Sequence, residues 1–202
     1  MLIYAGIDEA GYGPMFGPLC VGASVLVVQD HDPSHGAPDL WALLEHIVCR
    51  KRRDRNHRIA VNDSKKLKSS STAKGIMHLE RGVLAFLSCL HGTESPQMDD
   101  AFFSTIGCTS SNKPWCCGAI HLPVSVDPDQ LRIDTSRLHH GLEHTHVRCE
   151  MMACLAIDAE TYNERTEIES KAALNFSTAM HHVDAIVRRW PNNHPRIIID
   201  RH

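Results

Sequence analysis

Near its start the chain carries two adjacent carboxylates, Asp8 and Glu9, where a short apolar run gives way to a glycine-rich turn. The apolar run, Leu2–Ile7, alternates in the manner of a strand with one buried face. A second apolar run extends over Leu19–Val28 and is rich in valine. Because the turn between the two runs is too short for a crossover helix, we predict an antiparallel hairpin with the two acids at its corner.

The C-terminal part of the chain predicts a helix followed by a strand. Apolar residues recur at steps of three and four over residues 169–190, and Pro191 ends this pattern. The expected buried stripe consists of Ala173, Phe176, Met180, Val183, Val187 and Trp190. The apolar run Ile197–Ile199, ending in Asp200, predicts a central strand that is parallel to its neighbour and covered on both faces. We therefore expect the α/β class, with a mixed central sheet that starts as an antiparallel hairpin and has helices packed on it.

The middle of the chain contains further periodic segments. Apolar spacing predicts helices over residues 71–90 and 142–162. A shorter helix is expected over residues 39–48, with Asp39 as its N-cap. Residues 59–61 are expected to be a short extended piece.

Residues 91–141 mix glycine, proline, serine and cysteine without a clear period. Two short apolar pieces within them, 123–126 and 131–133, are expected as edge strands. A length of 202 residues suits one domain or one domain with an insertion. We therefore predict a single domain over residues 1–202, with an insertion at 91–141.

Composition narrows the class of protein. A hydrophobic content of 43% and a charged content of 22% are typical of globular domains. No apolar run approaches the roughly 20 residues of a membrane span, and the N-terminus has no signal-peptide pattern. We expect a monomeric, cytoplasmic protein that does not bind membranes.

The chain contains eight cysteines but no Cys-x-x-Cys pair. Buried free thiols are therefore the favoured interpretation, and a metal site around Cys108, Cys116 and Cys117 is the less favoured one. The fifteen histidines are expected mostly at the surface, including His139, His140, His181 and His182.

Asp8 and Asp200 each end a predicted strand. If these strands are parallel neighbours, both carboxylates reach the same edge of the sheet, where sites form in α/β proteins. Carboxylates suit Mg²⁺ or Mn²⁺, and two such ions activate a water and stabilise the leaving oxygen of a phosphodiester. Glu9 joins them only if the strand ends between Asp8 and Glu9, because consecutive strand residues face opposite sides. A solvated turn is the alternative interpretation of the two acids.

Gly11 and Gly13 flank Tyr12 in the turn after the acids. Without a Cβ, glycine backbone can approach a ligand closely, for example the ribose 2′-hydroxyl that distinguishes RNA from DNA. A hairpin turn that simply needs glycine is the alternative, and the glycines alone favour it.

A basic run lies in the middle of a chain whose net charge is −3. Its cations are Arg50, Lys51, Arg52, Arg53, Arg55 and Arg58, followed by Lys65, Lys66 and Lys68. The run is either a solvated loop or a set of phosphate contacts.

The segment Ala5–Pro14, with Gly17 and Pro18 after it, resembles the first motif of ribonucleases HII and HIII. Asp63–Leu67 resembles the second motif of that family. Residues 175–187, with the strand that ends at Asp200, are similar to the helix and strand before its third acidic residue. The first two motifs are specific, although together they cover a minor part of the chain.

The resemblance implies a ribonuclease H-like fold. It also implies divalent-metal hydrolysis of the RNA strand of RNA–DNA hybrids, leaving 5′-phosphate and 3′-hydroxyl ends. The implied ligands of Mg²⁺ or Mn²⁺ are Asp8, Glu9 and Asp200. The implied substrate contacts come from Gly11, Tyr12, Gly13, Ser64 and Lys65, with the serine and lysine on backbone phosphates.

Two features depart from the family's pattern. Tyr12 stands where the family has arginine, lysine or threonine, so a hydroxyl and a stacking face replace a charged contact. The family carries a fourth carboxylate further on, whereas the sequence ends at His202. We expect either a fragment of a longer reading frame or a degenerate protein. A non-catalytic nucleic-acid-binding protein on the same fold and a nuclease that acts on DNA are therefore alternatives.

Overall fold

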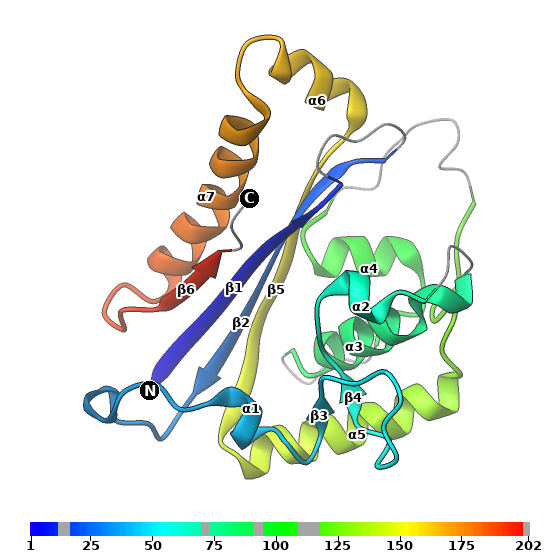
Figure 1. Ribbon diagram of the computed structural model, residues 1–202, viewed down its shortest axis with the longest axis vertical. Coiled ribbons are helices and arrows are strands. Elements are labelled where there is room, and N and C mark those ends of the chain that lie inside the picture. The colour runs from blue at the N-terminus through cyan, green and yellow to red at the C-terminus, as the bar shows by residue number, and fades with distance from the viewer. Residues whose placement is uncertain (12–16, 70–72, 91–94, 109–117, 200–202) are drawn as a thin grey trace. The chain divides into compact units, whose positions relative to one another are not determined.

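The computed structural model shows a chain that divides into two compact units (Figure 1). The first unit comprises residues 1–31, 102–118 and 150–202, and the second comprises residues 32–101 and 119–149. The structure describes residues 1–11, 17–69, 73–90, 95–108 and 118–199. None of the helices in these ranges is both long and apolar enough to cross a membrane.

Within the described residues, four strands form the sheet of the first unit, in the order β5-β2-β1-β6 (Figure 1). Strands β1 (Leu2–Ala10) and β2 (Leu19–Val28) pair antiparallel along their whole length, so the predicted hairpin is confirmed. Strand β6 (Arg196–Ile199) pairs parallel with β1. The sheet is therefore mixed and the class is α/β, as predicted.

Helices α6 (Ala159–Thr166) and α7 (Lys171–Arg189) pack with one face of this sheet around a common core. The buried core residues of the hairpin are Ile3, Ala5, Ile7, Leu19, Val21, Ala23, Val25 and Val27. Every second residue of each strand contributes, which is the period of a strand with one face on the core. The hairpin and α7 therefore form a single packing unit that fixes the direction of β1.

Helix α7 was predicted, but its buried stripe was predicted only in part. The buried residues of the helix are Leu174, Thr178, Ala179, His182 and Ile186. From the predicted stripe, Val183 and Trp190 pack against the core, whereas Phe176 is 65% exposed. The prediction missed the most buried positions in part because two of them carry polar side chains, which a hydrophobic pattern does not detect.

His182 shows how such a polar side chain is accommodated. It is buried, and its Nε2 lies 2.9 Å from the carbonyl oxygen of Val21 on β2. Because a carbonyl only accepts, Nε2 carries the proton in this hydrogen bond. The expectation that His182 is a surface residue is wrong, whereas His139, His140 and His181 are exposed as expected.

Strand β6 lies at an edge of the four described strands rather than in the centre of the sheet. Ile198 is 66% exposed and Ile199 is 40% exposed. The prediction of a central strand covered on both faces is therefore wrong for the described residues. A short run of isoleucine does not distinguish a central strand from an edge strand, since the difference lies in what packs on it.

Strand β5 (Val147–Ile157) occupies most of the segment predicted as a helix over residues 142–162, so that prediction is wrong. Leucine, methionine and alanine favour helices in isolation. Pairing with β2 along this segment overrides that local preference, and Met151 and Ile157 pack against the core of the first unit.

The second unit is built on α3 (Met77–Ser88) and α5 (Pro128–His144). A 3₁₀ turn, η2 (Ala73–Ile76), leads into α3, so the helix predicted over residues 71–90 is confirmed where the chain is described. Arg81 of α3 binds Asp134 of α5 through two hydrogen bonds, of 2.6 and 2.8 Å. This ion pair, with Asp134 almost fully buried, joins the two helices.

Residues 123–126 and 131–133 are not the predicted edge strands. The second piece lies inside α5, whose N-cap Asp127 is followed by Pro128 at the first helical position. This pair of residues is a helix-start signal that outweighs the short apolar run. The first piece is an irregular segment whose backbone amides at Val124, Ser125 and Val126 donate to the carboxylate of Glu80.

Short elements complete the second unit. Asp39 caps α1 (Leu40–Leu43) as predicted, but the helix ends well before Val48. Strands β3 (Val48–Cys49) and β4 (Ile59–Ala60) pair parallel, which confirms the extended piece at residues 59–61. The other short helices are η1 (Pro33–His35), α2 (Ser64–Leu67) and α4 (Asp99–Thr105), which runs from the second unit into the first.

Candidate functional site

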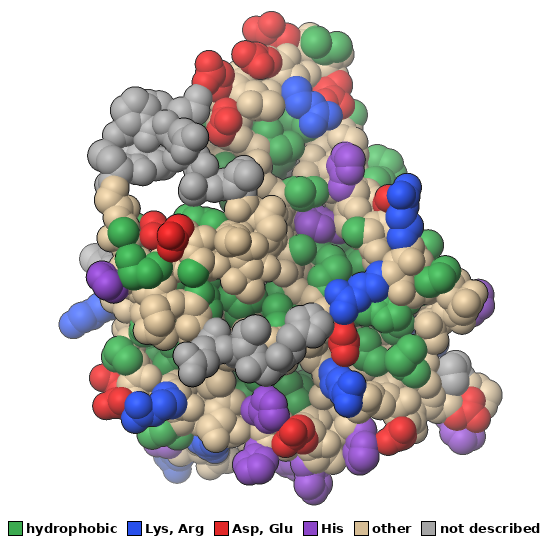
Figure 2. All heavy atoms as spheres, turned by 180° about the vertical axis from the view of Figure 1, so that it is seen from behind, with side chains coloured by type: hydrophobic (Ala, Val, Ile, Leu, Met, Phe, Trp, Pro, Cys, Tyr) green, Lys and Arg blue, Asp and Glu red, His purple; other side chains and the backbone are tan. Residues whose placement is uncertain are grey.

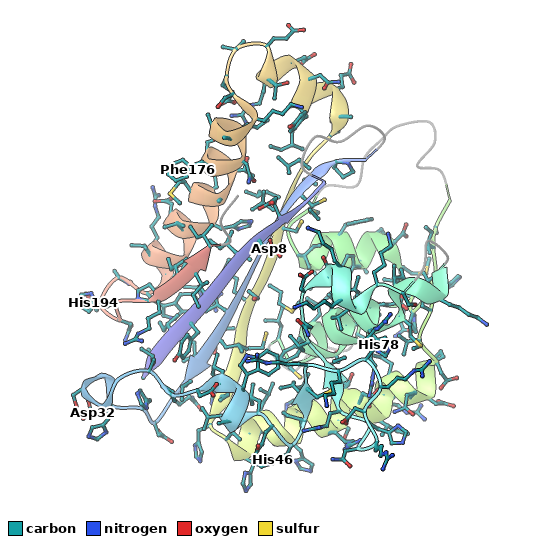
Figure 3. All side chains as sticks on the ribbon, viewed as in Figure 1. Asp8, Asp32, His46, His78, Phe176 and His194 are labelled. Carbon is teal, nitrogen blue, oxygen red and sulfur yellow. The ribbon has the colours of Figure 1, made fainter. Side chains whose placement is uncertain are left out.

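Asp8 lies near the C-terminal end of β1 and is exposed (Figure 3). It pairs with Gly22 of β2, and its Oδ1 accepts a hydrogen bond of 2.8 Å from the backbone amide of Glu9. The odd-numbered residues Ile3, Ala5 and Ile7 face the core. Asp8 therefore projects from the face of the sheet opposite to the core that α7 covers.

The pairing of β1 with β6 brings the two ends of the chain together. The partners run in parallel from Tyr4 with Arg196 to Ile7 with Ile199. The next residue after Ile7 is Asp8, and the next after Ile199 is Asp200, which lies outside the described residues. The first and last strands are therefore parallel neighbours, which is the condition for a shared acidic edge.

Glu9 does not share the face of Asp8. Strand β1 continues to Ala10, and Glu9 pairs with Val21 of β2. The expectation that the strand ends between Asp8 and Glu9 is therefore wrong, and the two side chains point to opposite sides. Within the ranges described above, no group of three His, Cys, Asp or Glu residues is arranged to hold a metal ion. A metal site that includes Asp8 would therefore need further ligands from outside this set of described residues.

Gly11 follows the end of β1 in a left-handed conformation, with φ of +83°. A Cβ on Gly11 would lie 2.5 Å from the carbonyl oxygen of Pro18. The turn therefore requires glycine at this position whether or not a ligand binds there. Tyr12 and Gly13, the other two predicted contacts of the turn, lie outside the described residues.

Ser64 and Lys65 belong to the second unit. They open α2, and the side chain of Asp63 caps this short helix by accepting a 2.8 Å hydrogen bond from the amide of Lys65. Leu67 at the other end is buried against Cys49 and Ala60 of the β3–β4 pair. The two predicted phosphate contacts are therefore exposed side chains on an anchored turn.

A group of thiols lies close to the acidic strand, which spacing in the sequence could not reveal. Cys20 on β2 pairs with Ala10 and shares the face of Asp8. Its thiol is hydrogen-bonded to Cys154 of β5, and the Cys108 thiol donates to the Cys154 carbonyl at 3.0 Å. None of the six described cysteines forms a disulfide, as predicted, but only Cys49 and Cys149 are buried, so the predicted burial is confirmed for these two alone.

These contacts predict an unusually reactive Cys20. The hydrogen bond from Cys154 lowers the pKa of Cys20 to about 7, and burial opposes this shift. Because the thiolate is the nucleophile, alkylation of Cys20 by iodoacetamide should rise with pH to half its maximum near pH 7. Removing the donor in a Cys154→Ala variant should move this midpoint upward, toward the ordinary thiol value. Peptide mass spectrometry after short alkylation pulses gives the profile of each cysteine.

Cys89 is the matched internal control for this experiment. Burial raises its pKa to about 11, so it should remain unmodified at pH 7 in the same sample. Equal labelling of Cys20 and Cys89 at neutral pH would contradict the assigned hydrogen bond.

No protein-family model matches the chain, and no match was found among curated proteins or solved structures. The functional argument therefore rests on the residues and their arrangement.

Proposed function

We propose that this protein is an endoribonuclease that hydrolyses the RNA strand of RNA–DNA hybrids with the aid of Mg²⁺ or Mn²⁺. The observation that carries the proposal is the parallel register of β1 and β6, in which Asp8 and Asp200 follow the paired residues Ile7 and Ile199. Acidic residues near the carboxyl ends of adjacent parallel strands form a suitable edge for a divalent cation. The resemblance of the first two motifs to ribonucleases HII and HIII supplies the substrate class.

In this proposal each residue has a defined task. Asp8 and Asp200 would hold the metal, which would supply an activated water and charge stabilisation for the phosphodiester. Water attacks phosphorus and the 3′ oxygen leaves, which gives a 3′-hydroxyl and a 5′-phosphate. The backbone at Gly11 approaches the ribose, and Ser64 and Lys65 contact phosphates. Glu9 faces the other side of β1 in this register, so the proposal rests first on the two aspartates.

A substrate panel with metal removal tests the proposal. Labelled RNA–DNA hybrid, DNA duplex and RNA duplex are incubated with the full chain in Mg²⁺, in Mn²⁺ or in EDTA. We expect cleavage of the RNA strand of the hybrid alone, loss of cleavage in EDTA and recovery when excess Mg²⁺ is added. Products should carry 3′-hydroxyl ends. Full activity in EDTA would contradict the proposal, and preferential cutting of the DNA duplex would indicate a different nuclease.

The orientation of Glu9 favours a second candidate, a non-catalytic protein that binds nucleic acid. With Glu9 on the opposite face, the described residues supply a single acid at the proposed edge. This candidate predicts binding of the hybrid that weakens with salt, and no turnover in any divalent metal. Cleavage that follows single-hit kinetics and copurifies with the chain would exclude it.

A further inference from the structure

The loop between β3 and β4, residues 50–58, is the most basic segment of the chain, and we refer to it as the basic loop. Two of its cations are engaged within the second unit: Arg50 lies 4.4 Å from the centre of the Trp41 ring, and Arg58 forms an ion pair with Asp54. The other four are Lys51, Arg52, Arg53 and Arg55. These four are exposed, and none has an acidic partner among the described residues.

The electrostatic environment of the loop is positive. His78 on α3 (Figure 3) has a lowered pKa, first because it is partly buried and then because of the charges of Arg81 and Arg52. On the face seen in Figure 2, lysine and arginine are dispersed among acidic and neutral residues. With a net charge of −3 for the whole chain, the basic loop is a local feature rather than part of a general field.

At the C-terminal end of the basic loop, side chains around it hold the backbone of residues 56–58 in place. Arg81 donates to the carbonyl oxygens of His57 at 2.7 Å and Arg58 at 3.2 Å, and Arg137 donates to that of Asn56 at 3.2 Å. Arg58 itself donates to the carbonyl oxygen of Glu45 at 2.8 Å. A loop fixed in this way loses less conformational entropy when a partner binds, so its unpaired cations are better placed than those of a free tail.

The basic loop adjoins the segment that carries Ser64 and Lys65. The amide of Val61 donates to the carbonyl oxygen of Cys49 at 2.8 Å, and the side chain of Asn62 donates to that of Arg50 at 2.8 Å. These bonds place the start of the Ser64 segment beside the start of the loop. Its exposed cations are Lys65, Lys66 and Lys68.

We propose that the basic loop and the neighbouring lysines of residues 65–68 together bind the phosphate backbone of nucleic acid. The identification of the partner as nucleic acid rests on the proposed function, whereas the surface itself is defined by its own contacts. Cations that are exposed, unpaired and held on a fixed backbone match a repeating array of phosphates. Such binding releases counterions and therefore depends on salt but not on base sequence.

Fluorescence anisotropy with a labelled RNA–DNA hybrid in EDTA tests this surface, because binding is then measured without cleavage. The variant carries four changes, Lys51→Gln, Arg52→Gln, Arg53→Gln and Arg55→Gln. Each lost phosphate contact reduces the slope of log Kobs against log salt by about 0.9. We expect the slope to fall by about 2 to 4, and affinity at ~0.1 M salt to fall about 100-fold or more.

Arg132→Gln is the matched control, since Arg132 is an exposed cation of the same unit that is paired with Asp129. It should leave both the slope and the affinity unchanged. A milder double variant, Arg52→Gln with Arg53→Gln, should show about half of the loss in slope and affinity. Thermal melting of this variant and of wild type separates the loss of phosphate contacts from a loss of folding. Unchanged hybrid binding in the fourfold variant overturns the inference, as does stronger competition by polyglutamate than by DNA.

The outcomes also separate this inference from the proposed function. Cleavage that persists in the fourfold variant, with unchanged binding, would leave the endonuclease proposal standing and remove the basic loop from it. Salt-dependent binding through the loop without turnover in any metal would retain the loop and remove the endonuclease proposal.

Discussion

Replacement of Asp8 by asparagine is expected to lower the rate of hybrid cleavage by at least about 100-fold. Asparagine keeps the oxygen that accepts the Glu9 amide, so the local hydrogen bond at the end of β1 survives. It removes the negative charge that, in the proposed mechanism, would hold the metal. A metal ion stabilises the charge of the transition state by several kcal/mol. Because each 1.36 kcal/mol corresponds to a tenfold change in rate, loss of this stabilisation accounts for a reduction of about 100-fold or more. The measurement is the initial rate on a labelled hybrid in saturating Mg²⁺.

Asp184→Asn is the matched control for this substitution. Asp184 is an exposed carboxylate of the same unit, on α7, where it pairs with Arg188. The same chemical change there should leave the rate within about twofold of wild type, because surface ion pairs contribute little. Both variants should bind the hybrid normally in EDTA. An Asp8→Asn variant with wild-type rates would remove the acidic edge from the mechanism.

Replacement of Asp134 by alanine is expected to destabilise the second unit by about 3–5 kcal/mol. The side chain of Asp134 is 1% exposed and that of Arg81 is 13% exposed. Asp134 also accepts a hydrogen bond from Gln130. Its removal leaves the guanidinium of Arg81 in a largely buried position without its partner, which is the costly way to break such a pair. The measurement is the free energy of unfolding from urea denaturation followed by circular dichroism.

Asp129→Ala on the same helix provides the comparison. Asp129 and Arg132 form an ion pair whose side chains are 78% and 81% exposed. Loss of this pair should cost less than about 1 kcal/mol. If the two substitutions lowered the free energy of unfolding equally, burial of the Arg81–Asp134 pair would not determine its contribution to stability. The result also bears on the basic loop, because Arg81 donates to its carbonyl oxygens.

Several of the confirmed predictions depended on adjacent residues. The hairpin followed from two apolar runs joined by a turn too short for a helix. Asp39 was predicted as an N-cap and caps α1, although the helix that follows is shorter than expected. Caps and tight turns satisfy backbone groups within a few residues, so their signal is complete in the local sequence.

Predictions that depended on distant residues failed more often. The segment that forms β5 has helix-favouring residues, and its pairing with β2 decides its conformation. On α7, Thr178 and His182 are buried because Leu174 and Val21 offer carbonyl acceptors. A hydrophobic pattern cannot identify these polar core positions, since it carries no information about their partners.

For the candidate site, the sequence by itself determined the residue types: acids after the first and last strands, a glycine in the turn, and a basic run before the second motif. The tertiary structure alone decided three further points. It made β1 and β6 parallel neighbours, it turned Glu9 away from the face of Asp8, and it brought the Cys20 thiol to that face. The physical reason is that the chemistry of a side chain is a property of one residue. The register of paired strands, and the face of the sheet on which a side chain lies, depend instead on pairing between strands far apart in the chain.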